Sequence, residues 1–359
     1  MDNPFIGVGF HAVGGVAHGS FYVPFKRVQG WAWESAWLVQ GFSAWIIMPW
    51  LAAGLTNSHP LLAFSQTPWS TLVLTFLFGA MWGAGSLTFG MSMRYLGMSL
   101  GMSVALGFTV SLGTLVPPLF AGHFDALVNN LGGFVVLLGI ATCLGGIGLC
   151  GLAGIRRERE CNVEPERVAR KSLTLGFAMA TFSGIMSAGF AFGIQVGAPI
   201  AQAAYANGAP AIFKNGPVFI IVMAGGFLIN FLWCATLSLS NRSLGNLIDT
   251  RQNLPLGNNY FWASISGAIW YFGFMMYGMG TTFMGRYDFT SWSIHLAFVI
   301  VVSTICGIMA KEWFGVKPAT AVMVGVALVV LISSTLVIAL GNRMVPAPPP
   351  LSAVPADTR

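Results

Sequence analysis

Charged side chains are scarce in this chain. Of its 359 residues, 8% are charged and 55% are hydrophobic. A soluble domain carries about 25% charged residues, which cover its surface. A soluble fold would leave this chain with too few charges for its exterior, whereas its long apolar runs suit helices that cross a bilayer. The composition therefore predicts an all-α integral membrane protein whose environment is the lipid bilayer.

Reactive motifs are also missing. The five cysteines are odd in number and form no CxxC pair, so neither a disulfide framework nor a metal site is expected. The sequence has no GxSxG elbow, no HExxH and no phosphate-binding GxxxxGK[ST] motif. We therefore expect no enzyme, no cofactor and no ATPase in this chain. The basic residues lie in connecting segments, which argues against nucleic acid as a partner.

Ten apolar runs are present, each about as long as the roughly 20 residues that a bilayer-crossing helix needs. Their approximate limits are 5–23, 34–54, 70–92, 98–119, 132–153, 173–194, 214–237, 260–280, 289–310 and 317–340. The least clear division is between the third and fourth runs, around Gly97. We therefore predict ten transmembrane helices.

An internal repeat links the two halves of the sequence. Seven residues around Trp82 recur in the same register 188 positions later, around Trp270. They are Gly79, Ala80, Trp82, Gly85, Gly90, Met91 and Gly97, matched by Gly267, Ala268, Trp270, Gly273, Gly278, Met279 and Gly285. Weak internal symmetry of this kind is typical of secondary transporters. With five helices per half, the second half must be inverted relative to the first.

The predicted organisation follows from this repeat. Residues 1–153 form a first five-helix repeat, 154–172 a charged cytoplasmic linker, 173–340 a second five-helix repeat and 341–359 a disordered proline-rich tail. Of the 17 Lys and Arg residues, 13 fall in connections on one side, including the 156–171 loop, and 4 on the other. Because cytoplasmic loops are enriched in Lys and Arg, both termini are expected on the outer side of the membrane.

Polar groups at membrane depth are costly and are therefore candidates for function. Asp288, Ser291 and His295 are spaced i, i+3 and i+7, which places them on one helix face. A carboxylate, a hydroxyl and an imidazole on one stripe suit proton uptake and hydrogen bonding to a polyol. The alternative is that Asp288 lies at the headgroup level and pairs with Arg286.

Other polar residues are weaker candidates. His11 and His18, seven residues apart, share one face of the first run. Glu34 begins the second run, where it is either a proton site or simply a carboxylate favoured at a helix N-terminus. Gln195 is a neutral group that either binds substrate or joins helices.

Trp82 and Trp270 occupy matching places in the repeat. The C–H faces of sugars stack on aromatic rings, so this pair is a candidate wall of a sugar site, with helix or lipid packing as the alternative. Tryptophans near the ends of runs, such as Trp50 and Trp69, are better interpreted as interfacial anchors.

Long consecutive segments of the chain resemble the L-rhamnose–proton symporter family, within the drug/metabolite transporter superfamily. The resemblance extends over nearly the whole chain and is carried by His11, residues 21–26, 31–34, 43–50, 78–83, 93–99 and 287–288, Ser291, Trp292, His295 and residues 311–313. It implies two inverted five-helix repeats in a bacterial inner membrane. It also implies proton-driven uptake of a 6-deoxyhexose.

Combined with the residues above, the resemblance yields a hypothesis for the site. Asp288, His295 and Glu34 are the candidates for proton coupling. The sugar is expected to contact His11, Trp82, Gln195, Trp270 and Ser291. Two other functions remain open at this stage: an exporter of drugs or metabolites with the same fold, and a sugar-sensing receptor that does not transport.

Overall fold

The computed structural model describes residues 3–57, 59–120, 128–161, 166–248, 255–284 and 291–344. Within these ranges the chain is helical and contains no strand. The long helices are α1 (Pro4–Ser20), α6 (Trp69–Leu96), α7 (Met98–Phe120), α9 (Leu131–Cys161), α10 (Glu166–Val196), α12 (Gly216–Ser240), α14 (Leu256–Met284), α15 (Ser291–Met309) and α16 (Pro318–Met344). Short helices are α2 (Tyr22–Phe25), α5 (Pro60–Ser65), α11 (Ala198–Ala206), α13 (Gly245–Ile248) and the 3₁₀ turn η2 (Ala211–Phe213).

The second apolar run is not a uniform helix. It comprises α3 (Trp33–Phe42), the π-helical turn η1 (Ser43–Ile47) and α4 (Met48–Thr56). Pro49, at the start of α4, has no backbone N–H with which to continue an α-helical ladder, which is consistent with the irregular turn before it. π-Turns of this kind occur frequently at functional sites.

The predicted division at Gly97 is confirmed. Helix α6 ends at Leu96 and α7 begins at Met98, with Gly97 between them at φ 83°. Only glycine adopts this backbone conformation without strain, so one residue is enough to reverse the chain here. The charged linker was predicted to begin at residue 154, but α9 continues through Cys161. Likewise α16 continues to Met344, and the rest of the predicted tail lies outside the described residues.

Six helical segments among the described residues are long and apolar enough to cross a bilayer. They are Trp33–Thr56, Trp69–Leu96, Leu131–Cys161, Leu173–Ala206, Ala211–Ser240 and Pro318–Gly341. The described structure thus supports an integral membrane protein, while ten spans remain a prediction.

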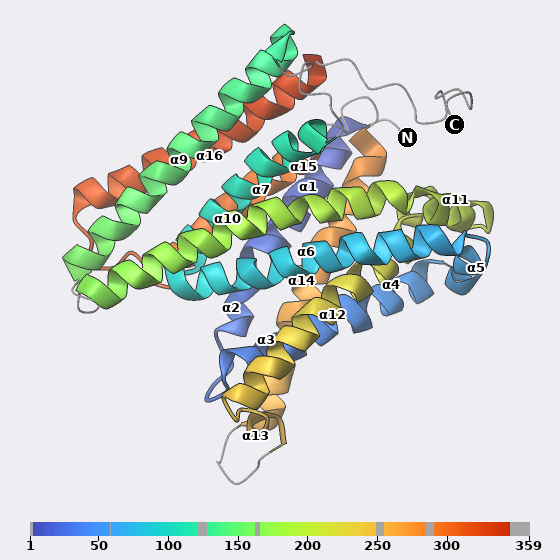
Figure 1. The fold of residues 1–359 in the computed structure, drawn as a ribbon, viewed down its shortest axis with the longest axis horizontal. Helices are drawn as coiled ribbons and strands as arrows, with labels where there is room; N and C mark the ends of the chain where they lie inside the picture. Colours follow the sequence, from blue (N-terminus) through green and yellow to red (C-terminus); the bar gives the residue numbers. More distant parts are fainter. Residues whose placement is uncertain are drawn as a thin grey trace.

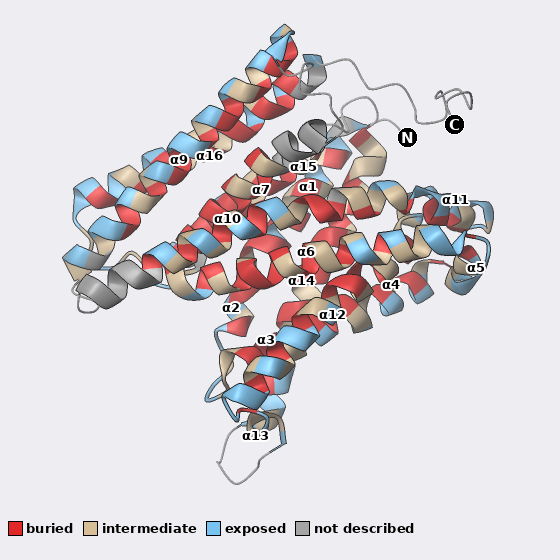
Figure 2. Cartoon of the chain, in the orientation of Figure 1, coloured by how far each residue is buried: buried red, intermediate tan, exposed pale blue. Residues whose placement is uncertain are grey.

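The exterior of these helices is apolar. On α16, Val322, Val326, Val329, Leu336 and Leu340 are all exposed and recur at helical spacing, so they form one stripe. A stripe of this size would aggregate in water, whereas in a bilayer it is the natural lipid-facing surface. Figure 2 shows exposed residues along the outer faces of α9 and α16, with buried residues between these helices.

The central helices cross one another closely. Helix α6 packs against α10 and α12, α14 packs against α1 and α3, and α9 pairs with α16 at one edge of the bundle (Figure 1). Glycine makes the closest crossings possible. A Cβ on Gly79 of α6 would lie 2.0 Å from the carbonyl oxygen of Val222 on α12. Such contacts are typical of helices that associate in lipid, where small residues let backbones approach.

An ion pair joins two distant connections at one end of the bundle. Lys26 Nζ lies 2.5 Å from Glu312 Oε1, and the side chain of Glu312 is 9% exposed. We expect Lys26→Glu to lower the free energy of unfolding by about 1 kcal/mol or more, because it places two carboxylates together. The double variant Lys26→Glu/Glu312→Lys should recover most of that loss in a thermal unfolding assay. A double variant no more stable than the single one would show that the pair contributes nothing.

Candidate functional site

Three tryptophans meet at the centre of the bundle. Trp45 is in η1, Trp82 in α6 and Trp270 in α14, and all three are buried. Trp45 stacks on Trp82 with ring centroids 4.9 Å apart and on Trp270 at 5.3 Å, and Trp82 and Trp270 lie 5.7 Å apart. Gly226 of α12 makes room for Trp45, since a Cβ there would lie 1.7 Å from its ring. The two tryptophans of the repeat therefore come together, as a shared wall requires.

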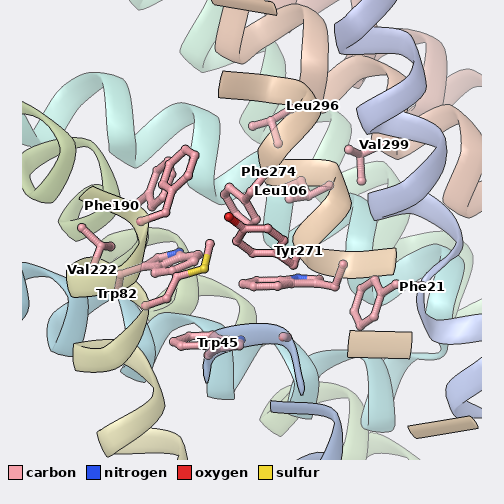
Figure 3. Close-up of a cluster of buried hydrophobic side chains, with 14 of the residues drawn as sticks. Phe21, Trp45, Trp82, Leu106, Phe190, Val222, Tyr271, Phe274, Leu296 and Val299 are labelled. Atoms are coloured by element: carbon pink, nitrogen blue, oxygen red, sulfur yellow. The ribbon is translucent and has the colours of Figure 1, made fainter. Parts of the chain in front are cut away.

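Two phenylalanines extend this aromatic wall. The Phe190 ring lies 4.8 Å from that of Trp82, and the Phe274 ring lies 4.7 Å from that of Trp270. Figure 3 shows Phe190 and Phe274 on one side of Trp82 and Trp45 on the other. Tryptophan and phenylalanine rings present flat apolar faces, which suit the C–H face of a sugar.

A cavity of about 70 Å³ lies beside the aromatic wall. It is lined by His18, Phe21, Trp82, Ser86, Phe89, Leu106, Thr109, Ser183, Ser187, Trp270, Phe274, Trp292, Leu296 and Val299. The lining is mainly apolar with a few polar groups, which is the usual composition of a small-molecule site. Ser183 Oγ is buried and has no hydrogen-bond partner within the described structure. This hydroxyl is therefore available to a ligand.

Three buried histidines lie next to the cavity. His11 and His18 come from α1 and His295 from α15. His18 Nδ1 lies 2.8 Å from His295 Nε2, which is a hydrogen-bond distance, and the rings of His11 and His295 are 6.0 Å apart. Only His18 of the three lines the cavity. His11 and His295, the two histidines predicted to be functional, thus belong to one cluster with His18, and the cluster contacts the cavity through His18.

Glycines allow the two helices carrying the histidines to meet. Gly15 and Gly19 of α1 have GxxxG spacing, and a Cβ on either would collide with Phe298 or Val302 of α15. The sequence spacing therefore sets how closely α1 and α15 approach.

Aromatic residues enclose the histidine cluster on one side. The Tyr277 ring lies 5.6 Å from that of His11 and 5.4 Å from that of His295. Trp292 lies 5.3 Å from Tyr277 and also lines the cavity. Ser291, one residue before it, is buried at the start of α15. Asp288, the predicted proton carrier on the same stripe, lies outside the described residues.

Glu34 is buried in the first turn of α3 and has dedicated partners. Its Oε1 accepts hydrogen bonds from Asn241 Nδ2 at 2.8 Å and from Ser243 Oγ at 2.9 Å. Glu34 is not among the residues that line the central cavity. The contacts agree with the alternative interpretation of this residue, a carboxylate stabilised by a helix N-terminus and by hydrogen bonds.

Gln195 lies in a different hollow from the tryptophans. This second hollow has a volume of about 370 Å³ and includes Gln202, Lys214, Asn215 and Thr282. Gln195 itself is exposed. The structure therefore brings Trp82 and Trp270 together and places Gln195 apart from them.

Sequence reasoning missed several members of the central cavity. Trp45 was identified only within residues 43–50, one of the segments that carry the family resemblance. Its position inside an apolar run, unlike that of Trp50 near the end of the run, could have distinguished it from an interfacial anchor. The hydroxyls of Ser183, Ser187 and Thr109 were not singled out. Serine and threonine are common in apolar helices, so no local signal separates the hydroxyls that line a cavity from those that bond to their own helix.

Known proteins resemble this chain over most of its length. The sequence profile of the L-rhamnose-proton symport protein family matches residues 1–344. The L-rhamnose-proton symporter of Escherichia coli (strain 55989 / EAEC) is 35% identical over 341 residues, which are 94% of this chain and 98% of that protein. The L-rhamnose-proton symporter of Shigella dysenteriae serotype 1 (strain Sd197) is 34% identical with the same coverage. No solved structure matches the chain. The chain therefore belongs to the L-rhamnose–proton symport protein family, which consists of transporters rather than enzymes.

Proposed function

We propose that this protein takes up L-rhamnose, or a closely related deoxy sugar, across the bacterial inner membrane together with protons. The observation that carries the proposal is the central cavity lined by Trp82 and Trp270, which has hydroxyls and a histidine in its wall. Family membership supports the substrate and the coupling ion.

The chemistry of the cavity fits a 6-deoxyhexose. Such a sugar is neutral, carries a methyl group and has hydroxyls that need partners. Trp82, Trp270 and Phe274 offer apolar faces, while Ser183 and His18 offer hydrogen-bonding atoms in the same lining. A neutral ligand needs no opposing charge, and none of the described residues that line the cavity is Asp, Glu, Lys or Arg. His11, Ser291 and Gln195 remain proposed sugar contacts, on a path that extends beyond the central cavity.

Two related glycine contacts support the proposed inverted repeat and, with it, alternating access. Gly79 of α6 faces the backbone of Val222 on α12, and Gly267 of α14 faces the backbone of Gln40 on α3. The glycines are 188 residues apart, and their partners are 182 apart. Gly79 and Gly267 are thus equivalent positions of the repeat, and each contacts an equivalent position in the other half. A two-fold axis in the membrane plane produces this kind of exchange.

A second set of contacts repeats the relationship. A Cβ on Gly90 would meet the ring of Trp37, and a Cβ on Gly278 would meet the ring of Phe219. The same separations, 188 and 182 residues, relate these two contacts. The agreement supports ten transmembrane helices in two inverted repeats, as in the drug/metabolite transporter superfamily. Rocking one repeat against the other would then expose the cavity to each side in turn.

The proposed proton path begins at the start of α15. Asp288 and His295 remain the proposed carriers, and His295 is the one that the structure connects to the cavity, through His18. Glu34 is a weaker candidate because Asn241 and Ser243 already satisfy its Oε1. We further propose that both termini are periplasmic and that the 156–171 connection is cytoplasmic. Reporter fusions at residue 359, active only in the periplasm, would test that orientation.

The proposed function is tested with the protein in liposomes. An acid-outside pH gradient should drive accumulation of radiolabelled L-rhamnose, and a protonophore should abolish it. Empty liposomes and L-mannose, which carries a hydroxyl in place of the C6 deoxy position, serve as controls. Absence of rhamnose flux, with flux of another solute or with net export, would overturn the substrate or the direction. Binding without flux would indicate a receptor.

A further inference from the structure

The hydrogen bond between His18 and His295 joins two buried rings, and each ring keeps one nitrogen outside that bond. His18 Nδ1 and His295 Nε2 are 2.8 Å apart, so one proton lies between them. His18 Nε2 and His295 Nδ1 are buried and have no partner in standard hydrogen-bond geometry among the described residues, although His18 lies near the backbone of Trp270 and His295 near that of His11. Buried polar atoms are normally satisfied, so two orphan nitrogens on one linked pair need an explanation.

The backbone around the pair leaves room for both rings of α1. A Cβ on Gly273 of α14 would lie 2.4 Å from the ring of His18, and a Cβ on Gly280 would lie 2.7 Å from that of His11. The absence of a side chain at both glycines therefore leaves space in which the imidazole rings pack. Because no larger residue fits there, these positions of α14 are built around the histidines.

Few other titratable groups face the pair. His11 on α1 and Tyr277 on α14 are the ones in ring contact with His295. In their described ranges, α1, α7, α14 and α15 carry no Asp, Glu, Lys or Arg. A proton held by the pair would therefore be shared between the two rings rather than passed to a neighbouring described carboxylate.

Counting protons shows what the pair can do. Two neutral imidazoles carry two N–H protons, so with one between the rings a single outer nitrogen is protonated and the other is bare. One added proton gives N–H⁺···N, a stronger charge-assisted bond, and both outer nitrogens then donate. A second added proton is opposed by a like charge one hydrogen bond away. The pair is thus suited to one proton per cycle.

We infer that the His18–His295 pair holds the proton that is transported with the sugar, and that the ring of His18, which lines the cavity, transmits the presence of that proton to the sugar site. This inference rests on the proposed function. Because the His18 ring lines the cavity, the positive charge that it shares on protonation acts on the hydroxyl oxygens of a sugar bound there. Proton and sugar therefore favour each other's binding, and by linkage the effect is reciprocal.

The test uses His18→Gln and His295→Gln in liposomes, with His59→Gln, an exposed position, as the matched control. Accumulation of rhamnose driven by the pH gradient should fall about tenfold or more in either variant. Exchange of labelled for unlabelled rhamnose at equal pH should continue in His295→Gln, because His295 does not line the cavity. In the wild type the apparent affinity for rhamnose should weaken as the pH rises, and in the variants this dependence should flatten.

Two results would overturn the assignment. Wild-type accumulation and an unchanged pH dependence in both variants would place the proton elsewhere. If His295→Gln also loses exchange, purified wild-type protein provides the deciding measurement. Rhamnose binding that takes up no proton from a weakly buffered solution, between about pH 6 and pH 8 around the ordinary range of histidine, would exclude the pair. Wild-type liposomes that carry no rhamnose would instead overturn the proposed function, and so the two failures are distinguishable.

Discussion

Replacing Trp270 by alanine is expected to raise the rhamnose concentration for half-maximal uptake by about fivefold, since an aromatic contact contributes about 1 kcal/mol and 1.4 kcal/mol is tenfold. Trp270 lines the central cavity, and its ring is held between Trp45 at 5.3 Å and Phe274 at 4.7 Å. Removing it takes away one face of the wall and loosens the others. Initial uptake rates in liposomes measure the effect, and Trp82→Ala should act in the same direction.

Trp69→Ala is the matched control for this experiment. Trp69 begins α6 and is 76% exposed, so its loss should leave the affinity unchanged. Trp270→Phe keeps an aromatic ring and should fall between wild type and Trp270→Ala. Because a buried tryptophan also contributes to stability, thermal unfolding of each purified variant separates a binding defect from a folding defect. Unchanged affinity in both Trp82→Ala and Trp270→Ala would place the sugar outside the central cavity.

Gly79→Ala and Gly267→Ala are expected to be among the most damaging single changes in the chain. The added Cβ would lie 2.0 Å from the carbonyl oxygen of Val222 in the first case and 2.3 Å from that of Gln40 in the second. Backbone atoms cannot move aside like the end of a flexible side chain, so the helices must separate. We expect each change to cost about 3 kcal/mol or more, at the upper end of overpacking effects. The yield and the unfolding midpoint of purified protein measure it.

Gly148→Ala in α9 is the control, because a Cβ there meets no atom within 4 Å. It should fold as well as the wild type. The pair of glycine variants also tests the repeat, because related contacts should respond alike. If Gly79→Ala and Gly267→Ala were both as stable as Gly148→Ala, the close crossings of α6 on α12 and of α14 on α3 would be wrong.

The sequence was informative wherever a short pattern determines the geometry. Low charge and long apolar runs predicted a helical membrane protein, and Gly97 predicted the division between α6 and α7. The repeat around Trp82 and Trp270 predicted that these residues occupy related positions, and the structure brings their rings within 5.7 Å. Each of these inferences depends on residues close in sequence or on exact register, which is why it needed no knowledge of tertiary packing.

Contacts between distant segments were beyond that reasoning. His18 and His295 are separated by 277 residues, and nothing local to either indicates that α1 and α15 meet. Glu34 accepts hydrogen bonds from Asn241 and Ser243, which lie in a connection more than half the chain away. The two interpretations of Glu34 could therefore not be separated from the sequence. Trp45 lies in an irregular turn, and its ring packs against Gly226. The periodicity of the sequence does not indicate a contact of this kind.

The central claim is that protons enter with the sugar, and the most direct test is to measure their movement together. Liposomes containing the protein are placed in a weakly buffered, unlabelled medium with a pH indicator outside, and L-rhamnose is added without an imposed gradient. The account predicts a rhamnose-dependent rise in external pH that is absent from empty liposomes and from the His18→Gln variant. Rhamnose entry with no change in external pH would contradict it.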